Sequence, residues 1–294
     1  MFSGSLVAAI TPMRHDDTID FEAWSRLVDF HVAHGTSGVV VGGTTGESAT
    51  LTEAELVELV TRARERAAGR LQVIAGAGTS STALTVERAG RLSRLGVDAL
   101  LVVTPAYNRP TQEGLYRHFE AVAQASIVPL ILYNVPSRTA VDLLPPTVAR
   151  LAALPRIAAI KEAVNSMERI GQLVALAPPG FTILSGDDAT ARDAVARGAR
   201  GVISVTANVA PRLVADMIAA ALAGDTRRAA ELDGRLAGLH EALFVEPNPI
   251  PAKWVVSQLL GLAPPGIRLP LTPLEPRHEA TLRRAMMAAG LALD

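Results

Sequence analysis

Short apolar runs recur through the first 225 residues of the chain, and an amphipathic segment follows most of them. Each run is about as long as a strand, and none shows the alternation of polar side chains that marks a strand with one exposed face. The runs therefore predict strands that are buried on both faces. They lie at residues 6–10, 38–41, 72–75, 99–103, 129–133, 157–160, 181–184 and 201–205.

The segments between the runs have the apolar periodicity of helices. Asp20 precedes the first segment as an N-cap, and Thr52 with Glu55 forms a capping box at the second. We expect helices at residues 21–34, 53–66, 84–95, 112–124, 145–154, 167–176, 189–197 and 211–223. Strands that alternate with helices eight times predict an α/β fold, the (β/α)8 TIM barrel.

A doubly wound open sheet also alternates strands and helices, and it is the main alternative fold. Such sheets usually carry a glycine-rich phosphate or dinucleotide turn after the first strand. Here the first run leads into Thr11-Pro12-Met13, which is no such turn. The sequence therefore favours the barrel.

The alternation stops after residue 225. Residues 227–243 have a helical pattern, the proline-rich segment 246–251 interrupts it, and further helices begin near Ala252 and Glu279. We therefore divide the chain into a barrel, residues 1–225, and a C-terminal helical extension, residues 226–294.

Composition argues against several classes of protein. The formal net charge is −1 with no run of like charges, so neither nucleic acid nor a membrane is expected as a partner. The chain has no cysteine, which removes disulfides, thiolate nucleophiles and cysteine–metal sites. No apolar stretch approaches the ~18 residues of a membrane span, and the N-terminal run is too short for a signal peptide. We expect a cytoplasmic protein.

Lysine is rare in this chain, because Lys161 and Lys253 are the only lysines among 28 lysine and arginine residues. Lys161 follows the apolar run 157–160, and TIM barrels carry their chemistry at the carboxyl ends of the strands. The ordinary interpretation is a strand-end lysine that reaches solvent. Desolvation would instead favour a neutral, nucleophilic amine. Since arginine serves elsewhere as the generic cation, we favour a catalytic Lys161 and a structural Lys253.

Other strand ends carry polar or glycine-rich segments. Tyr133 ends the run next to that of Lys161, where its phenol could transfer protons or close the top of the barrel. Tyr107 has a weaker claim to the same role. The glycine loop 42–46 could bind a carboxylate through backbone N–H groups or serve as a plain turn. Arg138 could clamp a second carboxylate or lie at the surface without a ligand.

Metal and triad chemistry have few suitable residues at these strand ends. The histidines fall in helices or loops away from them, at His15, His31, His34, His118, His240 and His278. Neither a zinc site nor a Ser-His-Asp triad is therefore expected. Asp187 and Asp188 could bind a metal, but we interpret them as caps of the following helix. No cofactor and no metal are expected.

Three segments in order along the chain resemble the dihydrodipicolinate synthases, a family of the pyruvate-dependent lyase superfamily that also contains N-acetylneuraminate lyase. They are Gly43-Thr44-Thr45-Gly46-Glu47-Ser48, Tyr133-Asn134-Val135-Pro136-Ser137-Arg138-Thr139 and Ile160-Lys161-Glu162. The resemblance runs from Met1 to the C-terminal helices and includes residues 245–251. Each segment alone is only suggestive, whereas three in order at the predicted strand ends are specific.

The resemblance implies a role for each matching residue. The catalytic residues would be Lys161, Tyr133, Thr44 and Tyr107, and the substrate-binding residues Thr45, Arg138, Ile203 and Gly186. Lys161 would form a Schiff base with pyruvate, and three hydroxyl groups would relay protons, with Tyr107 donated by a neighbouring subunit. The backbone around Thr44 and Thr45 would hold the pyruvate carboxylate, and Arg138 would grip the carboxylate of the second substrate.

The implied reaction condenses pyruvate with L-aspartate 4-semialdehyde to 4-hydroxy-tetrahydrodipicolinate, which opens diaminopimelate and lysine biosynthesis, without metal or organic cofactor. Family members are usually homotetramers, built as a pair of tight dimers. Two alternatives remain open. A 2-keto-3-deoxy acid or N-acetylneuraminate-type aldolase would share Lys161 and Tyr133 but would not need Arg138. The other is a non-catalytic oxo-acid sensor, against which the presence of all these residues argues.

The sequence departs from part of this family at the positions that bind lysine in regulated members. These positions form a cleft at the tight-dimer interface, and here they are Glu53, Leu56, Ser80, Leu84 and Ala106. The leucines would leave charges of a bound lysine unpaired, and Ala106 removes a covering aromatic ring. We predict insensitivity to feedback by lysine, although Glu53 could still pair with one ammonium group.

Overall fold

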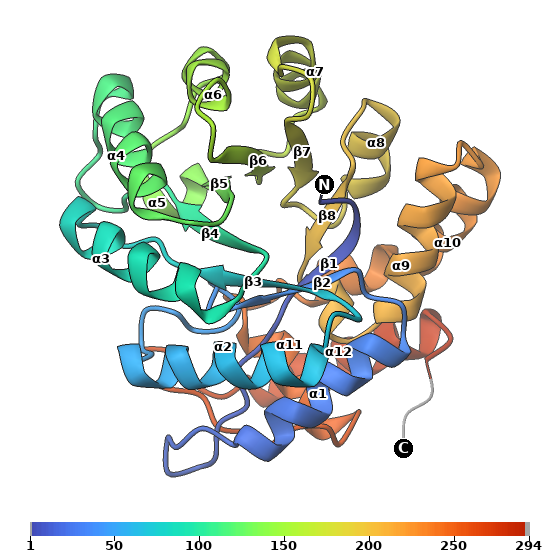
Figure 1. The fold of residues 1–294 in the computed structure, drawn as a ribbon. Coiled ribbons are helices and arrows are strands. Elements are labelled where there is room, and N and C mark those ends of the chain that lie inside the picture. The colour runs from blue at the N-terminus through green and yellow to red at the C-terminus, as the bar shows by residue number, and fades with distance from the viewer. Residues whose placement is uncertain (1, 292–294) are drawn as a thin grey trace.

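A computed structural model describes residues 2–291. In this part of the chain eight parallel strands form a closed barrel, each paired with the next and β8 paired with β1 (Figure 1). The strands are β1 (Gly4–Ala8), β2 (Gly38–Val41), β3 (Gln72–Gly76), β4 (Ala99–Val103), β5 (Leu130–Asn134), β6 (Ile157–Glu162), β7 (Thr182–Ser185) and β8 (Gly201–Ser204). The predicted TIM barrel is confirmed.

Helices surround the strands on the outside of the barrel (Figure 1). Those of the strand–helix alternation are α1 (Phe21–Ala33), α2 (Glu53–Ala67), α3 (Thr82–Leu92), α4 (Gln112–Ala125), α6 (Pro145–Ala152), α7 (Met167–Leu176), α8 (Ala191–Ala196) and α9 (Pro211–Leu222). The predicted N-cap at Asp20 and the capping box of Thr52 and Glu55 are both present. Each such cap typically stabilises its helix by about 1 kcal/mol.

Two of the local differences from the sequence-based prediction have a clear physical cause. Helix α3 begins at Thr82 rather than at residue 84, because the Ser81 hydroxyl accepts a hydrogen bond from the Leu84 N–H and caps the helix earlier. A short helix, α5 (Pro136–Thr139), forms in the loop after β5, where no helix was predicted. Proline at a first helical position already has the helical φ angle and needs no partner for an N–H.

The strands separate an inner apolar cluster from an outer one that packs against the helices. Because parallel strands of a barrel end at a common rim, the pairing register decides which side chains meet there. Tyr133 of β5 pairs with Lys161 of β6, and Lys161 pairs with Leu184 of β7. Tyr133 and Lys161 therefore lie next to each other at the carboxyl ends of the strands.

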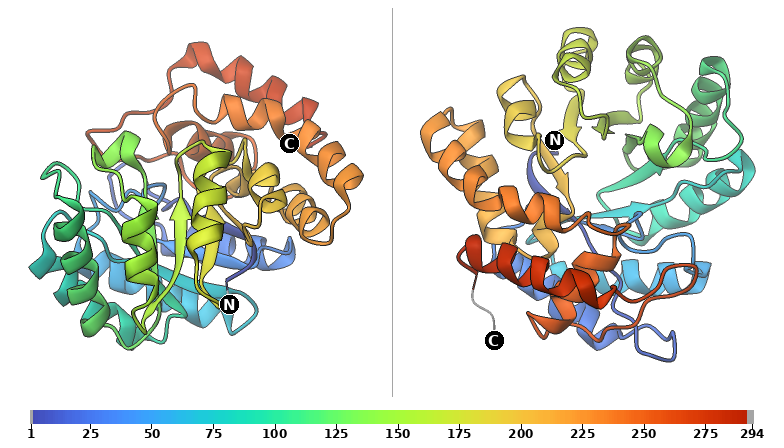
Figure 2. Two further views of the ribbon diagram at one scale, coloured as in Figure 1. Left: turned by 90° about the horizontal axis from the view of Figure 1, so that it is seen from above. Right: turned by 180° about the vertical axis from the view of Figure 1, so that it is seen from behind.

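Beyond the barrel the chain forms helices α10 (Thr226–Ala242), α11 (Ile250–Gln258) and α12 (Glu279–Ala288). Helix α10 packs on both α9 and α12 (Figure 2). The buried side chains of Leu232, Leu236 and Leu282 belong to the same apolar cluster as the outer face of the barrel. The division of the chain into domains at residue 225 stays a prediction. Within residues 2–291, no helix combines the length and the apolarity that crossing a membrane requires.

Candidate active site

A cavity of about 220 Å³ opens at the carboxyl ends of the strands. Its walls contain most of the residues that the sequence pointed to, namely Lys161, Tyr133, Thr44, Thr45, Arg138 and Gly186. These residues come from segments that are far apart in the chain, and the closed barrel brings their strand ends to one place. The cavity is therefore our candidate active site.

Lys161 lies near the end of β6 and is only 5% exposed. Its Nζ atom lies 4.4 Å from the centre of the Tyr133 ring. Among residues 2–291, no carboxylate lies within ion-pairing distance of Lys161. A buried amine that forms no ion pair within the described residues is well placed to act as a nucleophile on a ligand in the cavity.

Gly186 makes room for the Lys161 side chain at the end of β7. A Cβ atom added at Gly186 would lie 3.0 Å from Lys161 Cε and 2.9 Å from the Ala163 side chain. The Gly186 N–H donates to the Glu162 carbonyl over 2.7 Å, which ties the two strand ends together. A side chain at position 186 would therefore push on the lysine directly.

Glu162, the neighbour of Lys161 on β6, belongs to a separate polar network behind the strand. The Asn134 amide donates to both oxygens of the Glu162 carboxylate over 3.1 Å, and Arg169 Nη1 lies 3.6 Å from Oε2. Burial raises the pKa of Glu162 to about 7, although hydrogen bonds from Val164 N–H and Asn134 act in the opposite direction. Glu162 thus stabilises the ends of β5 and β6 instead of pairing with Lys161.

The glycine-rich loop after β2 supplies Thr44 and Thr45. Gly42 has a φ angle of +63°, which glycine adopts without strain and which turns the chain sharply over the barrel mouth. Thr45 is buried, and its hydroxyl accepts a hydrogen bond of 2.9 Å from the Asn248 amide. Thr44 lines the cavity beside it. The loop can therefore present hydroxyl and backbone N–H groups to a bound carboxylate.

Arg138 projects from the short helix α5 and lines the cavity. Its only side-chain hydrogen bond within the described chain is a long one of 3.4 Å to the Asn248 carbonyl oxygen. No carboxylate of residues 2–291 pairs with it. An exposed guanidinium that has no carboxylate partner within residues 2–291 is well placed at the cavity rim to bind the carboxylate of a ligand through two parallel hydrogen bonds.

Two predicted site residues do not reach the cavity in a single chain. Tyr107 is 93% exposed, and its φ angle of +72° turns the loop after β4 outward. Ile203 is buried inside the barrel, in the same cluster as Tyr133 and Leu184, and does not line the cavity. Outward placement is what a Tyr107 donated to a neighbouring subunit requires, whereas Ile203 contributes packing below the site.

The two aspartates after β7 have roles other than those expected. The interpretation of Asp188 as a cap of the next helix is wrong, because helix α8 begins at Ala191 and has no side-chain cap. Asp188 instead accepts the N–H groups of Val205 and Thr206, at 2.8 and 3.1 Å, and supports the turn after β8. Asp187 accepts hydrogen bonds from the N–H and hydroxyl of Thr190.

A possible metal-binding group lies outside the cavity. Glu246, Glu275 and His278 place ligand atoms within 4.8 Å of one another, and none of the three lines the cavity. Arg277 already pairs with Glu275 over 2.8 Å. This group therefore plays no part in the candidate active site.

Sequence reasoning assigned no role to Asn248, which lines the cavity from the segment before α11. Asn248 lies between Pro247 and Pro249, in a segment that interrupts the helical extension. Proline on both sides of a polar residue indicates an irregular segment, but this signal does not tell where in the fold the segment lies.

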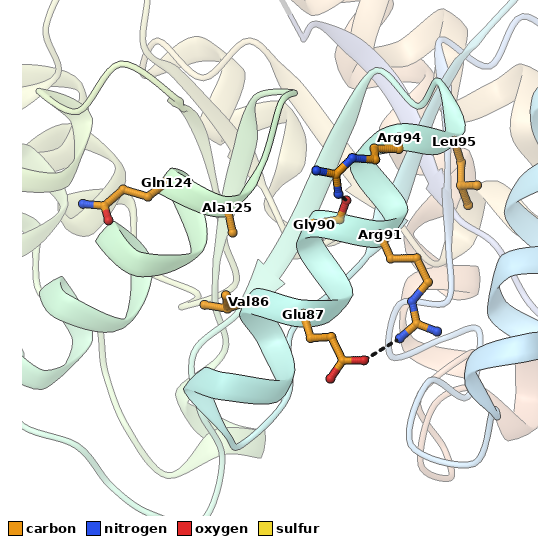
Figure 3. Close-up of a pocket in the computed structure, with 8 residues that line it drawn as sticks. All are labelled: Val86, Glu87, Gly90, Arg91, Arg94, Leu95, Gln124 and Ala125. Carbon is orange, nitrogen blue, oxygen red and sulfur yellow. Dashed lines mark hydrogen bonds and ion pairs between the residues drawn. The ribbon is translucent and has the colours of Figure 1, made fainter.

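A wider hollow lies on the outside of the barrel, between α3 and α4 (Figure 3). Its charged groups are largely satisfied within the hollow itself. Arg91 pairs with Glu87 over 3.3 Å, and Arg94 donates to the Gly90 carbonyl over 2.6 Å. None of the predicted site residues in the described chain lines this hollow. We therefore assign it no role in the chemistry.

Comparison with known proteins identifies the family. Residues 1–289 match the Dihydrodipicolinate synthetase family. The 4-hydroxy-tetrahydrodipicolinate synthase of Alkalilimnicola ehrlichii is 53% identical over 290 residues, with 99% of each chain covered. That of Methylococcus capsulatus is 52% identical over 291 residues, which cover 99% of this chain and 100% of the relative. The crystal structure of a dihydrodipicolinate synthase from Acinetobacter baumannii, complexed with pyruvate, is 44% identical, has a TM-score of 0.97, and matches 99% of this chain and 100% of its own. The chain belongs to the dihydrodipicolinate synthetase family, a family of lyases.

Proposed function

We propose that this chain condenses pyruvate with L-aspartate 4-semialdehyde to give 4-hydroxy-tetrahydrodipicolinate, the opening step of diaminopimelate and lysine biosynthesis. The observation that carries the proposal is Lys161, a buried amine without an ion-pair partner in the described chain, in a cavity that Arg138 also lines. The relatives named as this synthase support the same reaction.

Lys161 starts the reaction as a nucleophile. Its neutral amine attacks the carbonyl carbon of pyruvate, and loss of water gives a protonated imine on Nζ. The positive nitrogen withdraws electrons, so the pyruvate methyl group loses a proton and an enamine forms. Tyr133, whose ring centre lies 4.4 Å from Nζ, is placed to accept and return protons during these steps. Thr44 of the glycine-rich loop is a second hydroxyl group in the same cavity.

The second half of the reaction joins the two substrates. The enamine carbon attacks the aldehyde carbon of the semialdehyde, which forms a carbon–carbon bond and a hydroxyl group. The amino group of the bound intermediate then attacks the imine carbon, and the bond to Lys161 breaks. The cyclic product leaves, and the lysine returns to its free amine. No atom or electron pair is required from an additional cofactor.

Arg138 distinguishes this reaction from the related aldolase reactions. A 2-keto-3-deoxy acid or N-acetylneuraminate-type aldolase would not need a guanidinium at this position. Arg138 lies in the cavity wall, and within residues 2–291 it has no carboxylate partner. A free carboxylate on the second substrate is the group that such a guanidinium binds best.

A panel of aldehydes tests the proposed function. We expect the purified protein to consume L-aspartate 4-semialdehyde in the presence of pyruvate, with product detected by its reduction in a coupled reductase assay. N-acetylmannosamine and glyceraldehyde, each with pyruvate, serve as controls for the aldolase reactions. Faster turnover of either control aldehyde than of the semialdehyde would show that the chain is an aldolase of another specificity.

We also propose that the active enzyme is a homotetramer built from two tight dimers. The 93% exposed Tyr107 and the 59% exposed Leu84 support an interface on this side of the barrel, because large apolar and aromatic side chains gather at such contacts. A second chain placed there could donate its Tyr107 hydroxyl to the site. We propose the cytoplasm as the location.

The Gly186→Ala substitution is expected to slow imine formation. The new methyl group would meet Lys161 Cε at 3.0 Å and the Ala163 side chain at 2.9 Å, and overpacking of this kind typically costs 1–3 kcal/mol. A displaced nucleophile should lower the rate of pyruvate trapping by about tenfold or more. Gly171→Ala in helix α7 is the matched control, because an added Cβ there has no neighbour within 4 Å. Equal trapping rates for the two variants would contradict this account of Gly186.

Lysine is expected not to inhibit the enzyme in the sub-millimolar range. Glu53, the one acidic group predicted in the lysine cleft, already forms ion pairs with Arg88 and Arg91. The Ser80 carbonyl accepts the Asn108 amide, so it is also engaged. The measurement is the initial rate at fixed substrates with lysine raised into the millimolar range, and sodium chloride at the same ionic strength as control. Half-inhibition at sub-millimolar lysine would show that the cleft still binds it.

A further inference from the structure

Glu47 and Lys253 form a buried ion pair between the substrate loop, residues 43–48, and helix α11 of the C-terminal extension. Lys253 Nζ donates to Glu47 Oε1, and the two residues are 3% and 4% exposed. Neither residue lines the cavity. The pair is therefore separate from the residues that would touch substrate, and it joins parts of the chain that lie 206 positions apart.

The backbone of Glu47 closes the turn that carries the two threonines. Its N–H donates to the Thr44 carbonyl over 3.0 Å. Its φ angle of +58° lies in the left-handed region, which residues other than glycine rarely adopt. The other carboxylate oxygen accepts the Arg268 N–H over 3.1 Å. A turn in a strained conformation needs contacts that hold it there, and both carboxylate oxygens of Glu47 provide them.

The extension also holds the loop at a second point. Asn248, just before α11, donates its amide to the Thr45 hydroxyl over 2.9 Å. Lys253 lies in the first turn of α11, and its N–H donates to the Pro249 carbonyl. One helix start thus fixes the loop on both sides of Gly46, at Thr45 and at Glu47.

Stability alone is a poor explanation for such a pair. Removing two charges from water is costly, and replacing a buried ion pair by neutral groups is often neutral or stabilising. Burial lowers the pKa of Lys253, and the Glu47 carboxylate counteracts this effect. A charged pair in this place is better explained by the geometry that it imposes on the loop.

We propose that the Glu47–Lys253 pair is a positioning device, which holds the Thr44–Thr45 backbone in the conformation that binds the pyruvate carboxylate. This inference rests on the proposed function, since it assumes pyruvate as the first substrate. Glu47 and Lys253 act through the loop and are positioning residues, not catalytic ones. Loss of the pair should therefore weaken the pyruvate half of the reaction and spare the contact between Arg138 and the second substrate.

The test uses the double variant Glu47→Gln/Lys253→Met, which removes both charges and the tether but leaves an acceptor for the Arg268 N–H. The first measurement is the rate of borohydride trapping with pyruvate alone, so the identity of the aldehyde does not affect it. We expect trapping to slow by about tenfold to a hundredfold. We also expect the KM for pyruvate to rise while the KM for the semialdehyde stays unchanged, in a protein whose melting temperature exceeds that of the single Lys253→Met variant.

Two further variants keep the result interpretable. Glu47→Asp retains both charges but shortens the carboxylate by one methylene group, and we expect it to slow trapping severalfold with the fold intact. Arg192→Met/Asp233→Asn removes another ion pair between barrel and extension, of 3.0 Å between α8 and α10, and should trap pyruvate at the normal rate. Normal trapping by both Glu47 variants would overturn this inference alone. Absence of trapping in the unaltered chain would overturn the proposed function and this inference together.

Discussion

Replacing Lys161 by methionine is expected to abolish turnover while leaving the fold intact. Methionine has a similar volume and flexibility but cannot form an imine, so the covalent route is lost. We expect activity to fall by at least about a thousandfold, the scale seen when a covalent nucleophile is removed. Lys161 is 5% exposed, and none of the described carboxylates pairs with it, so the substitution also removes an unpaired buried amine. The melting temperature should therefore stay the same or rise.

Lys253→Met is the matched control for this prediction, because Lys253 is the only other lysine of the chain. Here the substitution leaves the Glu47 carboxylate buried without its partner, and breaking such a pair typically costs 3–5 kcal/mol. The melting temperature should fall by roughly 10 °C, with trapping slowed but still present. A Lys161→Met variant that keeps measurable turnover, or a Lys253→Met variant that loses all trapping while folded, would contradict this assignment of the two lysines.

Arg138→Ala is expected to raise the KM for L-aspartate 4-semialdehyde by about tenfold to a hundredfold. The estimate takes the net loss as one hydrogen bond to a charged group, about 1.5–3 kcal/mol, at about 1.4 kcal/mol per tenfold change. Trapping with pyruvate alone should stay nearly normal. Arg138 has only a 3.4 Å contact to a backbone carbonyl within the described chain, so its removal leaves little unsatisfied.

Arg138→Lys separates charge from geometry. Lysine keeps the positive charge but cannot form two parallel hydrogen bonds, and so we expect a KM between those of the unaltered enzyme and Arg138→Ala. The measurement is steady-state kinetics with each substrate varied in turn. Equal losses for pyruvate and the semialdehyde would mean that Arg138 supports the structure of the site and does not select the second substrate.

The fold was predictable because a parallel barrel requires a simple sequence pattern, in which apolar strands alternate with amphipathic helices. Runs such as 99–103 and 157–160 are apolar on both faces, as strands of a parallel barrel are. Capping residues such as Thr52 mark where helices of the alternation begin. The same pattern indicated where Lys161 and Tyr133 lie, since every strand end reaches the same rim. Their contact at 4.4 Å follows from the strand register, which pairs the two residues directly.

Contacts between residues that are far apart in the sequence could not be predicted from these local patterns. Lys253 was interpreted as a structural residue that could form an ion pair, but the sequence did not name its partner. The structure shows that Glu47, 206 positions away, is that partner. Asn248 was left without a role because nothing local indicates that its segment folds over the barrel mouth. The position of Ile203 could not be predicted for a related reason. The sequence indicates that a strand residue is buried, but not whether it lies at the cavity wall or below it.

The most direct test of the central claim is to trap the covalent intermediate. The protein is incubated with pyruvate and borohydride, digested, and the modified peptide is identified by mass spectrometry. We predict one adduct per chain, on the peptide that contains Lys161, and none when pyruvate is omitted. Absence of an adduct, or an adduct on Lys253, would contradict the account of this site as a Schiff-base centre.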